Sequence, residues 1–229
     1  MRPLTDSRPK PLLEVRGKAL LGWHVDALAQ GGFTELTINT AWLGEQISAY
    51  FEKQKSLEFN KYECKQLSIS YSHEGDDFGC ALETAGGIAR VLPQLGEVFW
   101  VLAGDVFTPD FAFTQAAVDR FLATGKLAHL WLVPNPPHHL KGDFGLTANG
   151  SALNLPMGSP QLRYTFSSIA LYRKAFFNTL PYGNPQGVKA ALAPLLRSAM
   201  DNELVSAELY TGLWADVGTP QRLAELNQH

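Results

Sequence analysis

The first half of the chain alternates between helical and strand-like patterns of hydrophobic residues. In residues 18–32, Leu20, Leu21, Val25 and Leu28 recur near helical spacing, and a glycine pair ends the pattern. The same reading predicts a strand at 35–41, a helix at 42–52, a strand at 67–72 and a helix at 84–95. This alternation is typical of βα units.

A nearly continuous apolar run, "EVFWVLAGD" at residues 97–105, has the pattern of a strand buried on both faces. Such a strand is expected where helices cover both faces of a parallel sheet. The later pattern predicts a helix near 111–124, strands at 128–133 and 166–172, a helix at 187–200 interrupted by Pro194, and a strand, turn and helix at 213–228. In the last of these, Thr219 and Pro220 match an N-cap followed by proline at the first helical position.

Together these elements predict an α/β protein with a Rossmann-like, mostly parallel central sheet and helices on both faces. The chain has 229 residues, 45% of them hydrophobic, so we expect a single domain over residues 1–229. Its 19 basic and 22 acidic residues are dispersed, which argues against nucleic acid or an anionic membrane as a partner. Two cysteines, Cys64 and Cys80, and no membrane-length apolar run or signal segment predict a reduced, cytoplasmic protein.

Two aspartates follow predicted strands directly. Asp105 ends the apolar run, and Asp216 follows "LWA" before a helix begins. Ligands of open parallel sheets bind outside the carboxyl ends of the strands, and carboxylate pairs hold hard cations such as Mg²⁺. The pattern therefore indicates a metal site, although each aspartate alone is equally typical of a turn or helix cap.

Two further segments have the chemistry of phosphate binding. "ETAGG", residues Glu83, Thr84, Ala85, Gly86 and Gly87, opens a helix whose amino end carries partial positive charge, although a simple strand-to-helix turn has the same pattern. Lys10 lies between Pro9 and Pro11 in "RPKPL", whose fixed φ angles limit where its ammonium can travel. A lysine on a solvated loop is the other interpretation of Lys10.

The order of these segments resembles the sugar-1-phosphate nucleotidyltransferase family over essentially the whole chain. The matching segments are "MRPLT…RPKPLLEV", "ETAGG", "VLAGDV" and "WADVGTP". The resemblance implies that a nucleoside triphosphate is joined to a sugar 1-phosphate with release of pyrophosphate, by direct in-line displacement. It implies Mg²⁺ on Asp105 and Asp216, a catalytic, phosphate-neutralising role for Lys10, and a loop at Glu83–Gly87 that faces the base and ribose.

Within that family, "INTAWLGEQI", "LETAGGI", "KGDFG" and "TFSSIALY" look most like the N-acetylmuramic acid 1-phosphate uridylyltransferases of cell-wall recycling. A weaker likeness to mannose-1-phosphate guanylyltransferases, or a thymidylyltransferase-like activity on glucose 1-phosphate, stays an alternative. The resemblance places Asn39, Gly142, Asp143, Phe144 and Ser167 against the sugar or nucleoside. Core packing for Phe144 and a strand-edge hydroxyl for Ser167 are the competing interpretations.

The family pattern also includes a strand and a glycine-rich loop, roughly "LAAGxGxR", before "MxPLT", and these do not precede Met1 in this sequence. We expect a sheet that lacks its first strand, and Arg2 does not occupy the position of the loop's arginine. Three hypotheses follow: a longer natural enzyme, which we favour, a non-catalytic protein that binds nucleotide or sugar phosphate, or an unstable product. An Asp-x-Asp glycosyltransferase signature and a dehydrogenase G-x-G-x-x-G are both missing from the sequence.

Overall fold

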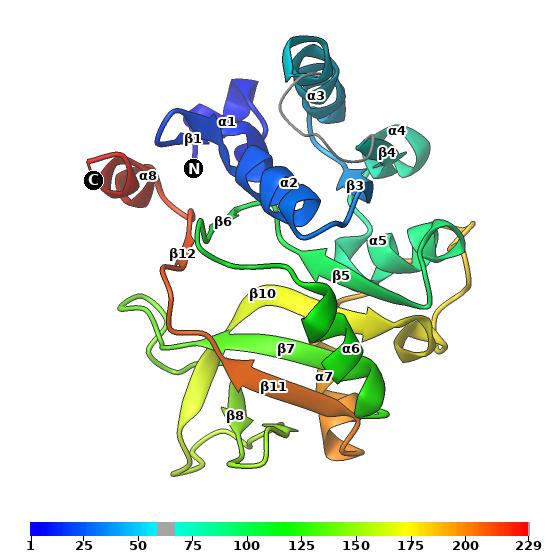
Figure 1. Cartoon of the computed structure of the whole chain (residues 1–229), viewed down its shortest axis with the longest axis vertical. Coiled ribbons are helices and arrows are strands. Elements are labelled where there is room, and N and C mark those ends of the chain that lie inside the picture. The colour runs from blue at the N-terminus through cyan, green and yellow to red at the C-terminus, as the bar shows by residue number, and fades with distance from the viewer. Residues whose placement is uncertain (59–66, 229) are drawn as a thin grey trace. The chain divides into compact units, whose positions relative to one another are not determined.

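The structure, a computed structural model, describes residues 1–58 and 67–228 and forms two compact units (Figure 1). The first unit combines Met1–Leu82, Gly104–Thr114 and Ala215–His229, and the second combines Glu83–Ala103 and Gln115–Trp214. The single domain expected over residues 1–229 stays a prediction. Cys80 is a free thiol, and Cys64 lies outside the described residues.

The first unit contains short helices and strands arranged around helix α2. Its elements, in chain order, are α1 (Leu4–Ser7), η1 (Lys10–Leu12), β1 (Glu14–Val15), β2 (Lys18–Ala19), α2 (Leu20–Gln30), β3 (Glu35–Thr40), α3 (Gly44–Glu58), β4 (Ser68–His73), α4 (Glu74–Phe78), β6 (Val106–Phe107), β12 (Ala215–Asp216) and α8 (Pro220–Leu226). The predicted strands at 35–41 and 67–72 correspond to β3 and β4, which pair in parallel.

One face of the β3–β4 pair is apolar and the other is polar. Leu36 and Ile38 of β3 pack on a core that includes Val25 of α2 and Ile47 of α3. Their sequence neighbours lie on the opposite face, since successive strand residues point to opposite sides. This alternation explains why helices cover one face of the pair.

A second core of the first unit packs beneath strands β6 and β12. It includes Leu20 at the start of α2, Phe107 of β6 and Val217, and all three side chains are fully buried. Trp23 packs edge-on against Phe107, with ring centroids 5.5 Å apart. Phe107 anchors β6 to this core, and Val217, which directly follows β12, anchors that strand. The neighbouring residues of both strands are therefore held in place.

The second unit contains a sheet of parallel and antiparallel strands, with helices on both faces. Its elements are α5 (Glu83–Val91), η2 (Leu92–Gln94), β5 (Val98–Leu102), α6 (Gln115–Ala123), β7 (Ala128–Val133), β8 (Phe144–Leu146), β9 (Ala152–Leu153), β10 (Arg163–Arg173), η3 (Lys174–Phe177), α7 (Leu192–Asp201) and β11 (Val205–Leu209). The predicted α/β class is confirmed.

The direction of the long strand β10 differs from the expected mostly parallel sheet. Strand β10 pairs antiparallel with β5, β7 and β8, whereas β11 pairs in parallel with β7. The strands β5, β7 and β11 therefore run in one direction, as expected, and β10 runs against them. The apolar pattern of residues 166–172 reports that the strand is buried on both faces, but it carries no information on direction.

Helices cover both faces of the sheet in the second unit, as predicted. Leu130 of β7 packs with Ile88 of α5 and Leu196 of α7 in one core. On the other face, the ring of His129 lies 6.4 Å from that of Phe121 in α6. Figure 1 shows α6 in front of this sheet and α7 behind it.

The predicted helix at 187–200 begins later than expected. Helix α7 starts at Leu192 after Ala191 as N-cap, so Pro194 lies in its first turn and does not interrupt it. Proline is accepted there because the first N–H groups of a helix have no partner within the helix. In the described ranges 1–58 and 67–228, no helix has the length and apolar character needed to cross a membrane.

Candidate active site

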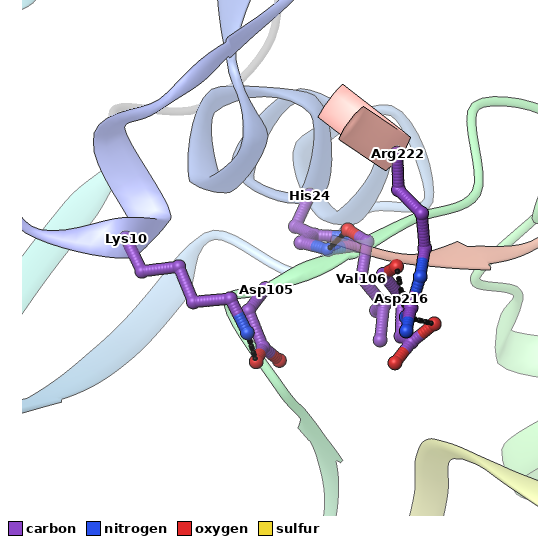
Figure 2. Close-up of polar contacts among 6 residues, drawn as sticks. All are labelled: Lys10, His24, Asp105, Val106, Asp216 and Arg222. Carbon is purple, nitrogen blue, oxygen red and sulfur yellow. Dashed lines mark hydrogen bonds and ion pairs between the residues drawn. The ribbon is translucent and has the colours of Figure 1, made fainter. Parts of the chain in front are cut away.

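The pairing of β6 with β12 brings the two predicted metal ligands onto neighbouring positions. Asp216 pairs with Val106, and the amide of Val217 donates to the carbonyl oxygen of Asp105 at 3.0 Å. Figure 2 shows both carboxylates on the same side of this short ladder. Their side chains are 38% and 35% exposed, so they can reach a ligand from solvent.

Lys10 and Asp105 form an ion pair in the first unit (Figure 2). Lys10 begins the 3₁₀ turn η1, which follows the proline before it. A Cβ at Gly104 would lie 3.3 Å from the ring of Pro11, so glycine allows η1 to approach the segment before Asp105. The structure therefore joins the two residues that the sequence assigned to phosphate and to metal.

Asp216 forms an ion pair with Arg222, a residue that the sequence did not single out. Its Nη1 donates to the carboxylate Oδ1 of Asp216 at 2.5 Å and to the carbonyl oxygen of Asp216 at 3.2 Å. As predicted, Thr219 is the N-cap of α8, and its hydroxyl accepts from the Arg222 amide at 3.2 Å. Along the chain, Asp216 and Arg222 are separated by the end of a strand, a turn and the start of a helix. No periodic pattern of residues could therefore have indicated their contact.

His24 lies beneath the strand that carries the site. It is 2% exposed, and its Nε2 donates to the carbonyl oxygen of Val106 at 2.9 Å (Figure 2). Burial lowers the pKa of His24 from 6.5 to about 4, against smaller opposing effects of the Val106 carbonyl and the Asp105 charge. The imidazole is therefore neutral near pH 7, and the proton is on Nε2 because a carbonyl can only accept.

A cleft of about 480 Å³ in the first unit joins Lys10 to another predicted site residue, Asn39. Asn39 is exposed near the end of β3. Arg2, exposed and paired with Asp6 at 3.2 Å, and Trp42 also line the cleft. Its volume is in the range of small-molecule sites.

The donor set at Asp105 and Asp216 suits a divalent cation that also binds substrate oxygens. Carboxylate oxygens are the ligands that Mg²⁺ prefers, and this ion often takes one or two carboxylates plus substrate phosphates. Among the residues that the structure describes, no cluster of three or more His, Cys, Asp or Glu side chains could hold a metal ion. Two aspartates would leave the other coordination positions of such a cation to water and substrate oxygens.

The predicted nucleotide loop, Glu83–Gly87, lies in the second unit at the start of α5. Glu83 and Thr84 are exposed, whereas Ala85, Gly86 and Gly87 are buried. The amides of Ala85 and Gly86 both donate to the carbonyl oxygen of Ala190, at 3.0 and 3.1 Å. In this structure the glycines thus serve packing, and the nucleotide role of the loop stays a prediction.

The remaining predicted substrate residues also belong to the second unit. Gly142 has a φ of 57°, and Asp143 accepts from the Phe166 amide at 2.8 Å and contacts His139 at 3.1 Å. Phe144 is 3% exposed within the core, and Ser167 is fully buried beside an irregularity in β10. The burial of Phe144 is the packing alternative noted from the sequence, whereas Ser167 is buried and is not a hydroxyl at an exposed strand edge. A substrate role for these residues stays a prediction.

Comparisons with known proteins agree with the motif order. Residues 1–155 match the family model described as nucleotidyl transferase. The N-acetylmuramate alpha-1-phosphate uridylyltransferase of Neisseria meningitidis serogroup B is 46% identical over 227 residues, covering 98% of this chain and 90% of that protein. The mannose-1-phosphate guanylyltransferase catalytic subunit beta of Dictyostelium discoideum is 27% identical, and the match covers 96% of this chain but 58% of that protein.

A solved structure shares the fold at low sequence identity. It is a putative glucose-1-phosphate thymidylyltransferase from Bacillus anthracis, with a TM-score of 0.72 and 19% identity, covering 100% of this chain and 89% of that one. The family model and the Neisseria relative both cover most of this chain, and the fold is the same. The chain therefore belongs to the nucleotidyl transferase family.

Proposed function

We propose that this protein is a uridylyltransferase that joins UTP to N-acetylmuramate 1-phosphate and releases pyrophosphate. The observation that carries the proposal is the grouping of Lys10, Asp105 and Asp216 in one unit, with both carboxylates on one side of the β6–β12 ladder. The choice of substrates rests on the relative that is 46% identical and bears this activity in its name.

The chemistry is an in-line displacement at phosphorus. A phosphate oxygen of the sugar 1-phosphate forms a bond to the α-phosphorus of UTP, and the bond from that phosphorus to the bridging oxygen of pyrophosphate breaks. No covalent intermediate with the protein is needed, so positioning and charge neutralisation provide most of the rate. Lys10 has the charge and placement to offset the phosphates while it holds Asp105.

A divalent cation, which we propose to be Mg²⁺, would be held by Asp105 and Asp216 and would supply charge neutralisation at phosphate oxygens. The carboxylates contribute the oxygen ligands, and their basic partners, Lys10 and Arg222, keep two negative side chains stable on one side of the ladder. With UTP and a cell-wall sugar phosphate as substrates, we also propose a cytoplasmic role in peptidoglycan recycling.

Pyrophosphate release tests the proposal directly. The chain is incubated with Mg²⁺, with UTP, GTP or dTTP, and with the 1-phosphates of N-acetylmuramate, mannose or glucose, and initial rates are compared. UTP with N-acetylmuramate 1-phosphate should give the highest kcat/KM. Faster release from GTP and mannose 1-phosphate would overturn the substrate assignment. Calorimetric binding of UTP without release from any pair would instead support a non-catalytic binding protein.

A further inference from the structure

We propose that Arg222 is a positioning residue, which holds the carboxylate of Asp216 in the orientation that binds the divalent cation. This inference rests on the cation site of the proposed function. It adds a residue that acts through Asp216 and contacts neither substrate nor cation.

The contact between the two residues has two points. Nη1 of Arg222 reaches the carboxylate Oδ1 of Asp216 at 2.5 Å and the carbonyl oxygen of the same residue at 3.2 Å. A donor shared by the side chain and the main chain of one residue restricts rotation of that side chain.

Arg222 is itself fixed by its surroundings. Its amide donates to the capping hydroxyl of Thr219 at 3.2 Å, and its side chain is only 25% exposed. A Cβ at Gly218 would lie 2.9 Å from Nη1 of Arg222 and 3.4 Å from Oδ2 of Asp216. Glycine at 218 thus leaves the space in which the guanidinium lies against Asp216.

The charges near the ladder support the same role. Asp105 is paired with Lys10 and Asp216 with Arg222, so each carboxylate has a basic partner on a different element. Residues that hydrogen-bond to a metal ligand and orient it typically affect metal affinity about 10- to 100-fold when they are changed. Loss of Arg222 should therefore weaken cation binding even though the two carboxylates remain.

Mn²⁺ binding, followed by the loss of the free-ion electron paramagnetic resonance signal, tests this without turnover. The titration uses the whole chain with UTP, corrected for Mn²⁺ bound by UTP alone. Arg222→Met should raise the Mn²⁺ dissociation constant about tenfold or more. Arg222→Lys, which keeps a positive charge, should restore part of the affinity.

Gly218→Ala provides a second perturbation that keeps the arginine. The added Cβ would displace the end of a flexible side chain and not backbone, so folding should be preserved while Mn²⁺ affinity falls. Gln221→Ala is the matched control on the same helix, since Gln221 bonds to Glu225 at 2.9 Å and should leave Mn²⁺ affinity unchanged. Circular dichroism checks the fold of every variant, and Gly218→Ala carries the test if Arg222→Met does not fold.

The outcomes separate the inference from the function on which it rests. Equal Mn²⁺ affinity in the wild type and in the folded Arg222 and Gly218 variants would refute the role of Arg222 alone. Tighter binding by Arg222→Met would also refute it, because the arginine would then compete with the cation. A wild-type chain that takes up no Mn²⁺ would refute the cation site itself, and the role of Arg222 with it.

Discussion

Acidification should destabilise the protein through His24, the neutral imidazole beneath β6. Its pKa is 6.5 for a free side chain and about 4 in the folded protein, mainly because burial disfavours the charged form. Between these two values the unfolded chain binds a proton that the folded chain does not. Stability therefore rises with pH through this window, and it falls as the pH is lowered from 6.5 towards 4.

The size of the effect follows from the same pair of values. One pKa unit corresponds to about 1.4 kcal/mol, so the full penalty is about 3 kcal/mol, and about 2 kcal/mol of it has developed at about pH 5. Solvent screening reduces this penalty only slightly, because the side chain of His24 is 2% exposed. Urea unfolding followed by circular dichroism at about pH 7.5 and pH 5 measures the loss.

His24→Gln isolates this contribution from other titrating groups. Its amide can still donate to the Val106 carbonyl, but it does not titrate, so its stability should fall less on acidification than that of the wild type. The difference between the two proteins should change by about 2 kcal/mol between these pH values. An equal pH dependence in both proteins would refute the assignment of a buried, neutral His24.

Three further predictions concern the site. Asp105→Ala and Asp216→Ala should each abolish Mg²⁺-dependent pyrophosphate release. The circular dichroism spectrum of each variant should stay native, because both side chains are part-exposed and outside the cores. Normal turnover in either variant would contradict the cation site. Lys10→Met should lower kcat/KM for UTP at least about tenfold, as expected for a lost charge-assisted bond, and unchanged initial rates would argue against a phosphate contact. Thr219→Ala should lower the free energy of unfolding in urea by about 1 kcal/mol, whereas Thr219→Ser, which keeps the capping hydroxyl, should stay near wild type.

Hydrophobic spacing predicted the order of the main elements because it reports which side chains are buried. The helix over Leu20–Gln30, the strands β3 and β4, and the capped helix α8 are where the pattern indicated. The direction of β10 could not be predicted, since a strand buried on both faces has the same composition whether its neighbours are parallel or antiparallel. The start of α7 was misjudged because proline ends a helix in its interior but is accepted in its first turn.

The site was partly predictable for a related reason. Asp105 and Asp216 were indicated because each follows a strand, and the ladder that joins them places them on neighbouring positions. Arg222 and His24 were missed because their contacts depend on how separate elements pack. Arg222 is a basic residue on a short helix, and His24 is a histidine on an apolar helix. Neither residue belongs to a sequence pattern that indicates its contact.

The first unit is assembled from three separate stretches of chain, and its last stretch, Ala215–His229, follows the whole of the second unit. During synthesis, the residues of the second unit therefore leave the ribosome before Asp216 does. Strand β6 has been made by then, but its ladder with Asp216 can form only once Asp216 has also been made. Assembly of the proposed cation site therefore waits until Asp216 has been made, and a stop codon anywhere from 106 to 216 yields a chain that has Asp105 but not Asp216.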